Sequence, residues 1–113
     1  MYTRLINKSE DYIEQHLSEP ISLADLANHT HFSTFHFHKI FKKYSSETVN
    51  QFVTRFKQER AAIFISVNRS ITLTEVALNY GYCDSSTFSK TFKHPFGVSP
   101  SNYRKQQELT RNR

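Results

Sequence analysis

Four histidines and one cysteine are the side chains with the widest chemistry in this sequence. His29, His31, His36 and His38 fall within ten residues, and imidazole is a common ligand of zinc and nickel. Residues two apart on a helix face different ways, however, and no cysteine or paired carboxylate completes a ligand set. Cys83 precedes a predicted helix, whose start could acidify a thiol and suit it to redox sensing. We prefer histidines that lie at the surface or against a partner, an inert thiol, and no metal.

Lysine and hydroxyl side chains make up most of the remaining polar chemistry, and they suit binding rather than catalysis. The sequence holds no glycine-rich phosphate loop and no convincing nucleophile–base pair, so we expect neither an enzyme nor a cofactor. Lysine can donate hydrogen bonds to guanine or to phosphate, and serine and threonine hydroxyls can donate or accept at base edges. The balance of 15 Lys+Arg against 10 Asp+Glu gives a net charge of +5. This balance favours a polyanionic partner, nucleic acid or an anionic membrane surface, over a merely lysine-rich surface.

Length and composition indicate one helical domain that could present these groups. The chain has 113 residues, of which 37% are hydrophobic and 14% aromatic, with two glycines and three prolines. It is too apolar for a disordered chain and poor in the turn residues of β folds. No charged-then-apolar leader opens it, and no apolar run is long enough to span a membrane. With a single cysteine, these features predict a cytoplasmic protein that has no membrane partner.

An internal repeat organises the chain. Residues 21–27 match residues 71–77 in kind at every position, an offset of 50 residues. Residues 37–42 align with residues 88–93 at an offset of 51, so one residue is inserted between the two blocks. Two copies of one helix-turn-helix unit are therefore predicted, over about 21–45 and 71–94.

The first copy begins with a helix-capping pattern. Ser22 followed by Asp25 is a capping box, in which the hydroxyl and the carboxylate satisfy backbone N–H groups at a helix start. A helix over about 23–29 follows, and Ser33 can cap a second helix over about 34–44. That second helix is expected to bury the apolar residues that recur every three or four positions: Phe37, Ile40, Phe41 and Tyr44.

The second copy repeats this order of signals. Thr72 and Glu75 form its capping box, and Gly81 supplies the turn because glycine adopts positive φ without steric cost. Small residues, Ala27 and Ala77, stand where the helices of each unit cross. The second helix spans about 85–93, is capped by Asp84 or Ser85, and buries Phe88 and Phe92.

Three further helices complete the prediction. A leading helix covers about 4–18, and a closing helix covers 99–105. The predicted domain spans 1–105 and ends with this closing helix. Thr48 can cap a long linker helix over 48–66. The tail 106–113 is polar and expected to fray or to begin a linker. The apolar stripe of the linker helix consists of Val49, Phe52, Val53, Phe56, Ile63 and Phe64.

These motifs resemble a known family. Residues 73–82, 88–93 and 96–100, with Tyr103-Arg104, closely resemble the C-terminal signature of the AraC/XylS family of bacterial transcription regulators. The stretch 11–23 looks most like the short regulators of the MarA, SoxS and Rob group. The resemblance covers about residues 7–105. It implies an all-α fold of about seven helices, with two homeodomain-like helix-turn-helix subdomains joined by a long linker helix.

The resemblance also implies that the second helix of each unit enters adjacent segments of the DNA major groove. The base-reading residues would be Thr34, Phe35, His38, Lys39, Ser85, Ser86, Thr87 and Lys90. We expect phosphate contacts from Ser33, His36, Lys42, Lys43, Arg55, Lys57, Lys93 and Arg104. Phe35 lies outside the periodic apolar face, so it either packs on the preceding turn or touches a thymine methyl or a sugar.

Several positions depart from the family pattern. Lysine stands at positions 39 and 90 where arginine is usual, and lysine cannot make arginine's planar bidentate contact to guanine. His31 and Ser46 stand where glycine is usual, which makes the shape of the first turn less certain than that of the second.

Sequence-specific binding of double-stranded DNA in transcription regulation is the leading functional prediction. Because one chain carries two reading helices, it could bind DNA as a monomer, in the cytoplasm at the nucleoid. It could act as an activator or a repressor, with RNA polymerase as a second partner. The alternative is a helical adaptor whose basic face binds RNA polymerase or another acidic protein. The chain could work alone or be the DNA-binding part of a longer protein.

Overall fold

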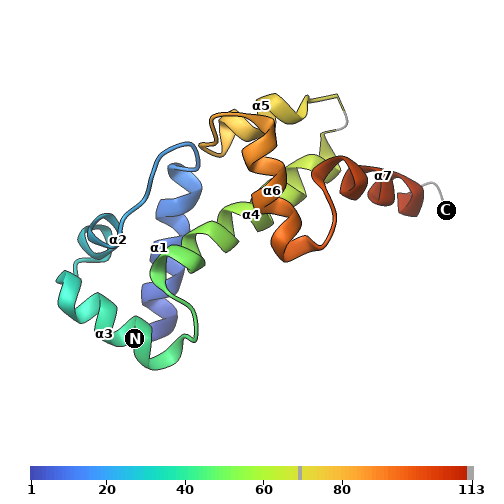
Figure 1. The fold of residues 1–113 in the computed structure, drawn as a ribbon. Coiled ribbons are helices and arrows are strands. Elements are labelled where there is room, and N and C mark those ends of the chain that lie inside the picture. The colour runs from blue at the N-terminus through green and yellow to red at the C-terminus, as the bar shows by residue number, and fades with distance from the viewer. Residues whose placement is uncertain (69, 112–113) are drawn as a thin grey trace. The chain divides into compact units, whose positions relative to one another are not determined.

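Seven α-helices and no strands make up the computed structural model, which describes residues 1–68 and 70–111 (Figure 1). The helices are α1 (Tyr2–Gln15), α2 (Leu23–Thr30), α3 (Thr34–Tyr44), α4 (Val49–Val67), α5 (Leu73–Asn79), α6 (Ser85–Phe96) and α7 (Pro100–Arg111). The chain divides into two compact units, Met1–Lys57 and Gln58–Arg113. The predicted all-α class is confirmed.

The predicted helix boundaries hold best for the three helices from α2 to α4. α2, α3 and α4 begin and end within one residue of the predicted positions. The prediction of 4–18 for the leading helix is wrong at both ends, since α1 covers Tyr2–Gln15. Its last turn closes when the His16 N–H donates to the Ile13 carbonyl at 3.1 Å. Such a short-range bond is typical of a helix terminus.

Two helices of the second unit run further than predicted. α6 continues to Phe96, and Gly97 ends it with φ 74°, a conformation that suits glycine. α7 continues to Arg111, so the prediction of a frayed tail from residue 106 is wrong for 106–111. Five of those six positions carry glutamine, glutamate, leucine or arginine, which are good helix formers. The last two tail residues lie outside the described part of the chain.

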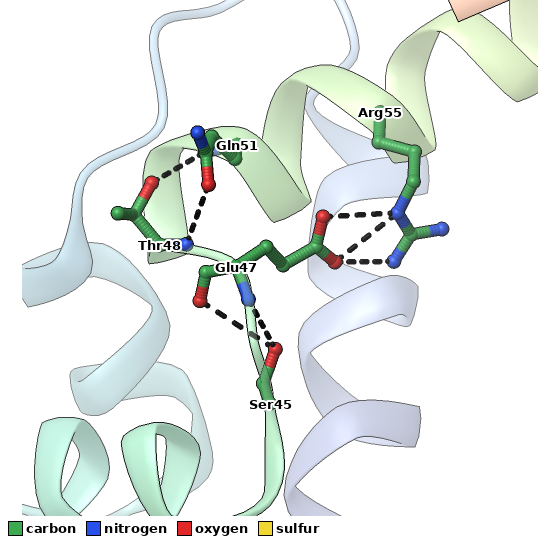
Figure 2. Close-up of polar contacts among 5 residues, drawn as sticks. All are labelled: Ser45, Glu47, Thr48, Gln51 and Arg55. Atoms are coloured by element: carbon green, nitrogen blue, oxygen red, sulfur yellow. Dashed lines mark hydrogen bonds and ion pairs between the residues drawn. The ribbon is translucent and has the colours of Figure 1, made fainter.

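Side-chain caps fix where α2, α3 and α4 begin. Ser22 and Asp25 form the predicted reciprocal capping box of α2. At the start of α4, the Gln51 N–H donates to the Thr48 hydroxyl at 3.1 Å, and the Thr48 N–H donates to the Gln51 side chain at 2.9 Å (Figure 2). These bonds satisfy N–H groups that a helix start otherwise leaves unpaired.

Aromatic rings dominate the core of the first unit. Phe37, Phe41, Phe52 and Phe56 follow one another with ring centroids 5.6 to 6.5 Å apart. Their neighbours in the same buried cluster are Leu5, Ile13, Leu26, Ala27 and Val53. Tyr44 was predicted to be buried, but it is 59% exposed. It lies in the last turn of α3, and its ring packs 5.2 Å from that of Tyr2 at the start of α1.

The second unit has an aromatic core of the same kind. The rings of Phe88 and Phe92 lie 5.7 Å apart, and Tyr103 of α7 packs 5.5 Å from Phe92. Val76 and Ala77 of α5 are fully buried in the same unit. The predicted burial of Phe88 and Phe92 is confirmed.

Buried residues along α4 change face part-way along the helix. The N-terminal half buries Phe52, Val53 and Phe56, and the C-terminal half buries Gln58, Ala61, Ala62 and Ile65. Ala61 follows Phe52 by nine positions, and at about 100° per residue this spacing places the two residues on opposite faces of the helix. The prediction of a single apolar stripe along this helix is therefore wrong. Ile63, which was assigned to that stripe, is 54% exposed.

Candidate nucleic-acid interface

The two helix-turn-helix turns begin with the same backbone structure despite different residues. His31 has φ 65° and Gly81 has φ 86°. The following N–H groups, of Phe32 and Tyr82, donate to the carbonyls of Ala27 and Ala77 at 3.0 and 2.9 Å. This is the bond pattern of a Schellman motif, which usually places glycine at the left-handed position. The usual turn therefore forms in the first unit even though a histidine occupies it.

The inserted residue of the second copy lies in its turn. Ser33 caps α3 by accepting the His36 N–H at 3.1 Å, and Asp84 caps α6 by accepting the Thr87 N–H at 2.7 Å. The turns correspond at an offset of 50 residues and the caps at 51, so Cys83 is the extra residue. Its thiol is exposed and free. Hydrogen bonds from Thr87 lower the pKa of the Asp84 carboxyl.

The predicted base-reading residues of α3 lie on its solvent face. Because Phe37 and Phe41 are buried, the opposite side of the helix is presented outward. The exposed residues there are Thr34, Phe35, His38 and Lys39, with Lys42 one turn further along. Phe35 is 71% exposed, so it does not pack down on the preceding turn. Of the two alternatives for this ring, only the one that leaves it available to a partner agrees with the structure.

The corresponding residues of α6 are also mostly exposed. Phe88 and Phe92 are fully buried, and Ser86, Thr87 and Lys90 point away from the core. Ser85 is half-buried, so it offers less surface than the others. Each unit thus presents one lysine at the same turn of its second helix, Lys39 and Lys90.

Five of the predicted phosphate contacts are exposed and flank the reading residues: Ser33, His36, Lys42, Lys43 and Lys93. Three of them are lysines in the last turn of α3 or α6, where a cation interacts favourably with the negative end of the helix dipole. These side chains therefore add positive charge beside both reading faces without a cost to the helices that carry them.

Arg55 has an intramolecular carboxylate partner. Its Nη2 and Nε atoms lie 2.7 and 3.1 Å from Oε1 of Glu47 (Figure 2). Its guanidinium also lies over the Phe52 ring, 5.6 Å from the centroid. The sequence analysis missed Glu47, because a pair eight residues apart across a helix start follows no local spacing rule. The pair ties the loop between α3 and α4 to the first turns of α4.

Lys57 and Arg104 also use their head groups within the protein. Lys57 Nζ donates to the Glu19 carbonyl at 2.7 Å, and burial lowers the pKa of this half-buried amine. Arg104 is half-buried, and its Nη2 donates to the Asn68 carbonyl at 3.3 Å. Their predicted phosphate contacts stay predictions, but each cation is held near the surface by a backbone carbonyl.

The clustered histidines do not converge. His29 packs 5.2 Å from the ring of Tyr12, whereas His36 meets the edge of Phe35. Within residues 1–68 and 70–111, no three His, Cys, Asp or Glu side chains are grouped as metal ligands would be. None of the described helices combines the length and the apolar character needed to cross a membrane.

A family model described as a helix-turn-helix domain matches residues 26–106, most of the chain. The chain belongs to the AraC-type helix-turn-helix family. PocR, a regulatory protein of Salmonella typhimurium, is 33% identical over 101 residues. That alignment covers 89% of this chain but only 33% of PocR, so the helix-turn-helix chain spans about a third of that relative.

Solved structures agree with this AraC-type fold. A DNA-binding transcriptional dual regulator of Escherichia coli K-12 superposes with a TM-score of 0.83, at 21% identity over 93% of both chains. The DNA-binding domain of AdpA, solved with a target DNA, superposes with a TM-score of 0.78 at 20% identity over 97% of both chains. At this level of identity the likeness establishes the fold. The closer likeness to the MarA, SoxS and Rob group stays a prediction.

Proposed function

We propose that this chain binds double-stranded DNA sequence-specifically in the regulation of transcription, and that α3 and α6 enter adjacent segments of the major groove. The observation that carries the proposal is the repeated unit itself. Each copy caps its second helix, buries one phenylalanine pair and presents a lysine on the outer face. A helix of this size fits the major groove, where all four base pairs are distinguishable. The DNA complex of AdpA, which shares the fold, supports this use of the architecture.

The two reading faces offer different chemistry. Lys39 and Lys90 can each donate to guanine or to a phosphate. On α6, Lys90 is accompanied by the hydroxyl groups of Ser86 and Thr87, which accept or donate with little selectivity, so shape and bridging water contribute to reading there. On α3, Lys39 is accompanied by Thr34, Phe35 and His38. The phenyl ring and the imidazole make that face the more selective one.

The first test is selection of binding sites from a random duplex pool. We expect two short boxes, one for each reading helix, about one helical turn or roughly 34 Å apart. Lys39→Ala and Lys90→Ala should each relax a different box, because each lysine belongs to a different unit. Lys105→Ala, a change at an exposed lysine of α7, is the matched control and should leave both boxes intact. If no site enriches, the proposal fails.

Phe35 yields a test at the level of one methyl group. We propose that its exposed ring contacts a thymine methyl in the first box. Replacing each thymine of the selected site in turn by deoxyuridine removes only that methyl. One replacement should weaken the wild-type protein several-fold and leave Phe35→Ala unaffected, since an apolar contact of this size contributes about 1 kcal/mol. Equal weakening of both proteins at every position would contradict the contact.

The proposal extends to partners and place of action. With two reading helices in one chain, a monomer suffices to occupy both boxes. Action at promoters in the cytoplasm would bring the bound protein near RNA polymerase, as a second partner.

A further inference from the structure

A groove lined by cations runs between α1 and the first helix-turn-helix unit. It consists of two adjoining hollows of about 650 and 440 Å³, which share Met1, His31 and Phe32. Four cationic side chains line them, Arg4 and Lys8 from α1 and Lys39 and Lys43 from α3. The imidazoles of His31 and His36 lie among them. No carboxylate of the described residues lines either hollow. The groove is therefore suited to an anion.

The groove is continuous with the proposed reading face. Lys39 and Lys43 line both the larger hollow and a shallower one on the outer side of α3. The start of α1 is held beside the end of α3 by the packing of Tyr2 on Tyr44, and the N-terminus lies next to α3 in Figure 1. An anion bound in the groove would thus lie beside a ligand that is bound to the outer face of α3.

The charged residues of α1 are arranged unfavourably with respect to its helix dipole. Arg4 lies in the first turn and Glu14 in the last, whereas the helix dipole favours acidic groups at the start and basic groups at the end. Among the described residues, neither Arg4 nor Lys8 makes an ion pair or a side-chain hydrogen bond. The fold therefore gains nothing evident from these two cations, which points to a role toward an external group.

We propose that the DNA backbone flanking the first box lies across this groove, with Arg4 and Lys8 as phosphate contacts. This inference rests on the proposed function. A helix seated in the major groove has a sugar–phosphate strand on each side, and the α1 side of α3 faces one of these strands. Phosphates match the cations, while deoxyribose can rest on the apolar floor that Phe32 and Ile40 provide.

The test compares salt dependence at the selected site for the wild type and for Arg4→Gln/Lys8→Gln. The slope of log K against log salt should fall in magnitude by about 0.9 for each phosphate contact removed, about 1.8 for both. Preference for the selected site over a scrambled one should stay the same, because phosphate contacts carry no direct sequence information. Phosphates whose ethylation weakens the wild type, but not the variant, should lie on one strand beside the first box.

The matched control is Gln15→Glu/Ser18→Glu, which makes the same change in net charge at exposed positions near the other end of α1. Gln15 and Ser18 line neither hollow. Gln15 lies about 16 Å along the helix from Arg4 and about 10 Å from Lys8, at or beyond the screening length of roughly 10 Å at 0.1 M salt, so this variant should keep a slope close to that of the wild type. Equal slopes for the wild type and Arg4→Gln/Lys8→Gln, or an equal loss in both variants, would overturn the proposal. An unfolding midpoint no lower than that of the wild type would show that the variant is folded. Failure of the proposed function would appear separately, as a wild type that selects no site.

Discussion

At the scale of single residues, His31 is the clearest departure from local preference. It holds φ 65° in the first turn, where Gly81 serves the second copy. A non-glycine residue in this region costs about 1 kcal/mol or more, although histidine tolerates it better than most residues do. We expect His31→Gly to stabilise the protein by about 0.5 kcal/mol, because the relief of strain exceeds the added flexibility of the unfolded chain. Denaturant unfolding at neutral pH measures this change.

The matched experiment is His31→Ala, which keeps a Cβ at the strained position. It should bring no comparable gain, and a gain equal to that of glycine would show that the imidazole, not the backbone, carries the cost. His31 also lines the cationic groove, so the DNA affinity of His31→Gly should be measured beside its stability.

At the scale of helices, the start of α6 depends on an ionised carboxyl group. The Thr87 hydrogen bonds lower the pKa of Asp84 in the folded chain. The stabilisation is therefore present above the unfolded pKa of about 3.9 and is lost as the pH falls through the lower, folded value. Asp84→Asn keeps a good capping side chain but does not titrate. It should unfold with a weaker dependence on acid, in thermal melts between neutral pH and about pH 2, than the wild type.

The exposed carboxylate of Asp11 provides the comparison for this cap, because among the described residues it caps no helix. Asp11→Asn should leave more of the acid dependence in place than Asp84→Asn does. If the two variants respond alike, the cap of α6 is not a source of acid sensitivity.

Helix positions were largely predictable, whereas the partners of individual side chains were not. Capping boxes and the 3.6-residue period are local signals, so α2, α3 and the start of α4 could be placed from the sequence. The change of buried face along α4 was missed, because periodicity reveals a stripe but not which neighbour covers it. The Glu47–Arg55 pair and the groove beside Arg4 depend on contacts between segments, which no local pattern encodes.

At the scale of the whole molecule, the outward residues of α3 and α6 were assigned from the family resemblance, and in the structure all of them except the half-buried Ser85 are exposed. The basic residues that give the net charge of +5 are not equally available to a partner. Lysines of the reading helices are exposed, whereas Arg55, Lys57 and Arg104 are engaged by a carboxylate or by carbonyl oxygens. The salt dependence of DNA binding should therefore report fewer phosphates than a count of all basic residues would suggest.

The extra residue of the second turn has a practical use. Cys83 is the sole thiol of the chain, is exposed, and stands immediately before the residue that caps α6. A fluorophore or a spin label can therefore be attached at one defined point of the unmodified sequence. Its emission or mobility would register the arrival of a duplex at the second unit, while the first unit remains unlabelled, so the occupancy of one box could be followed in real time.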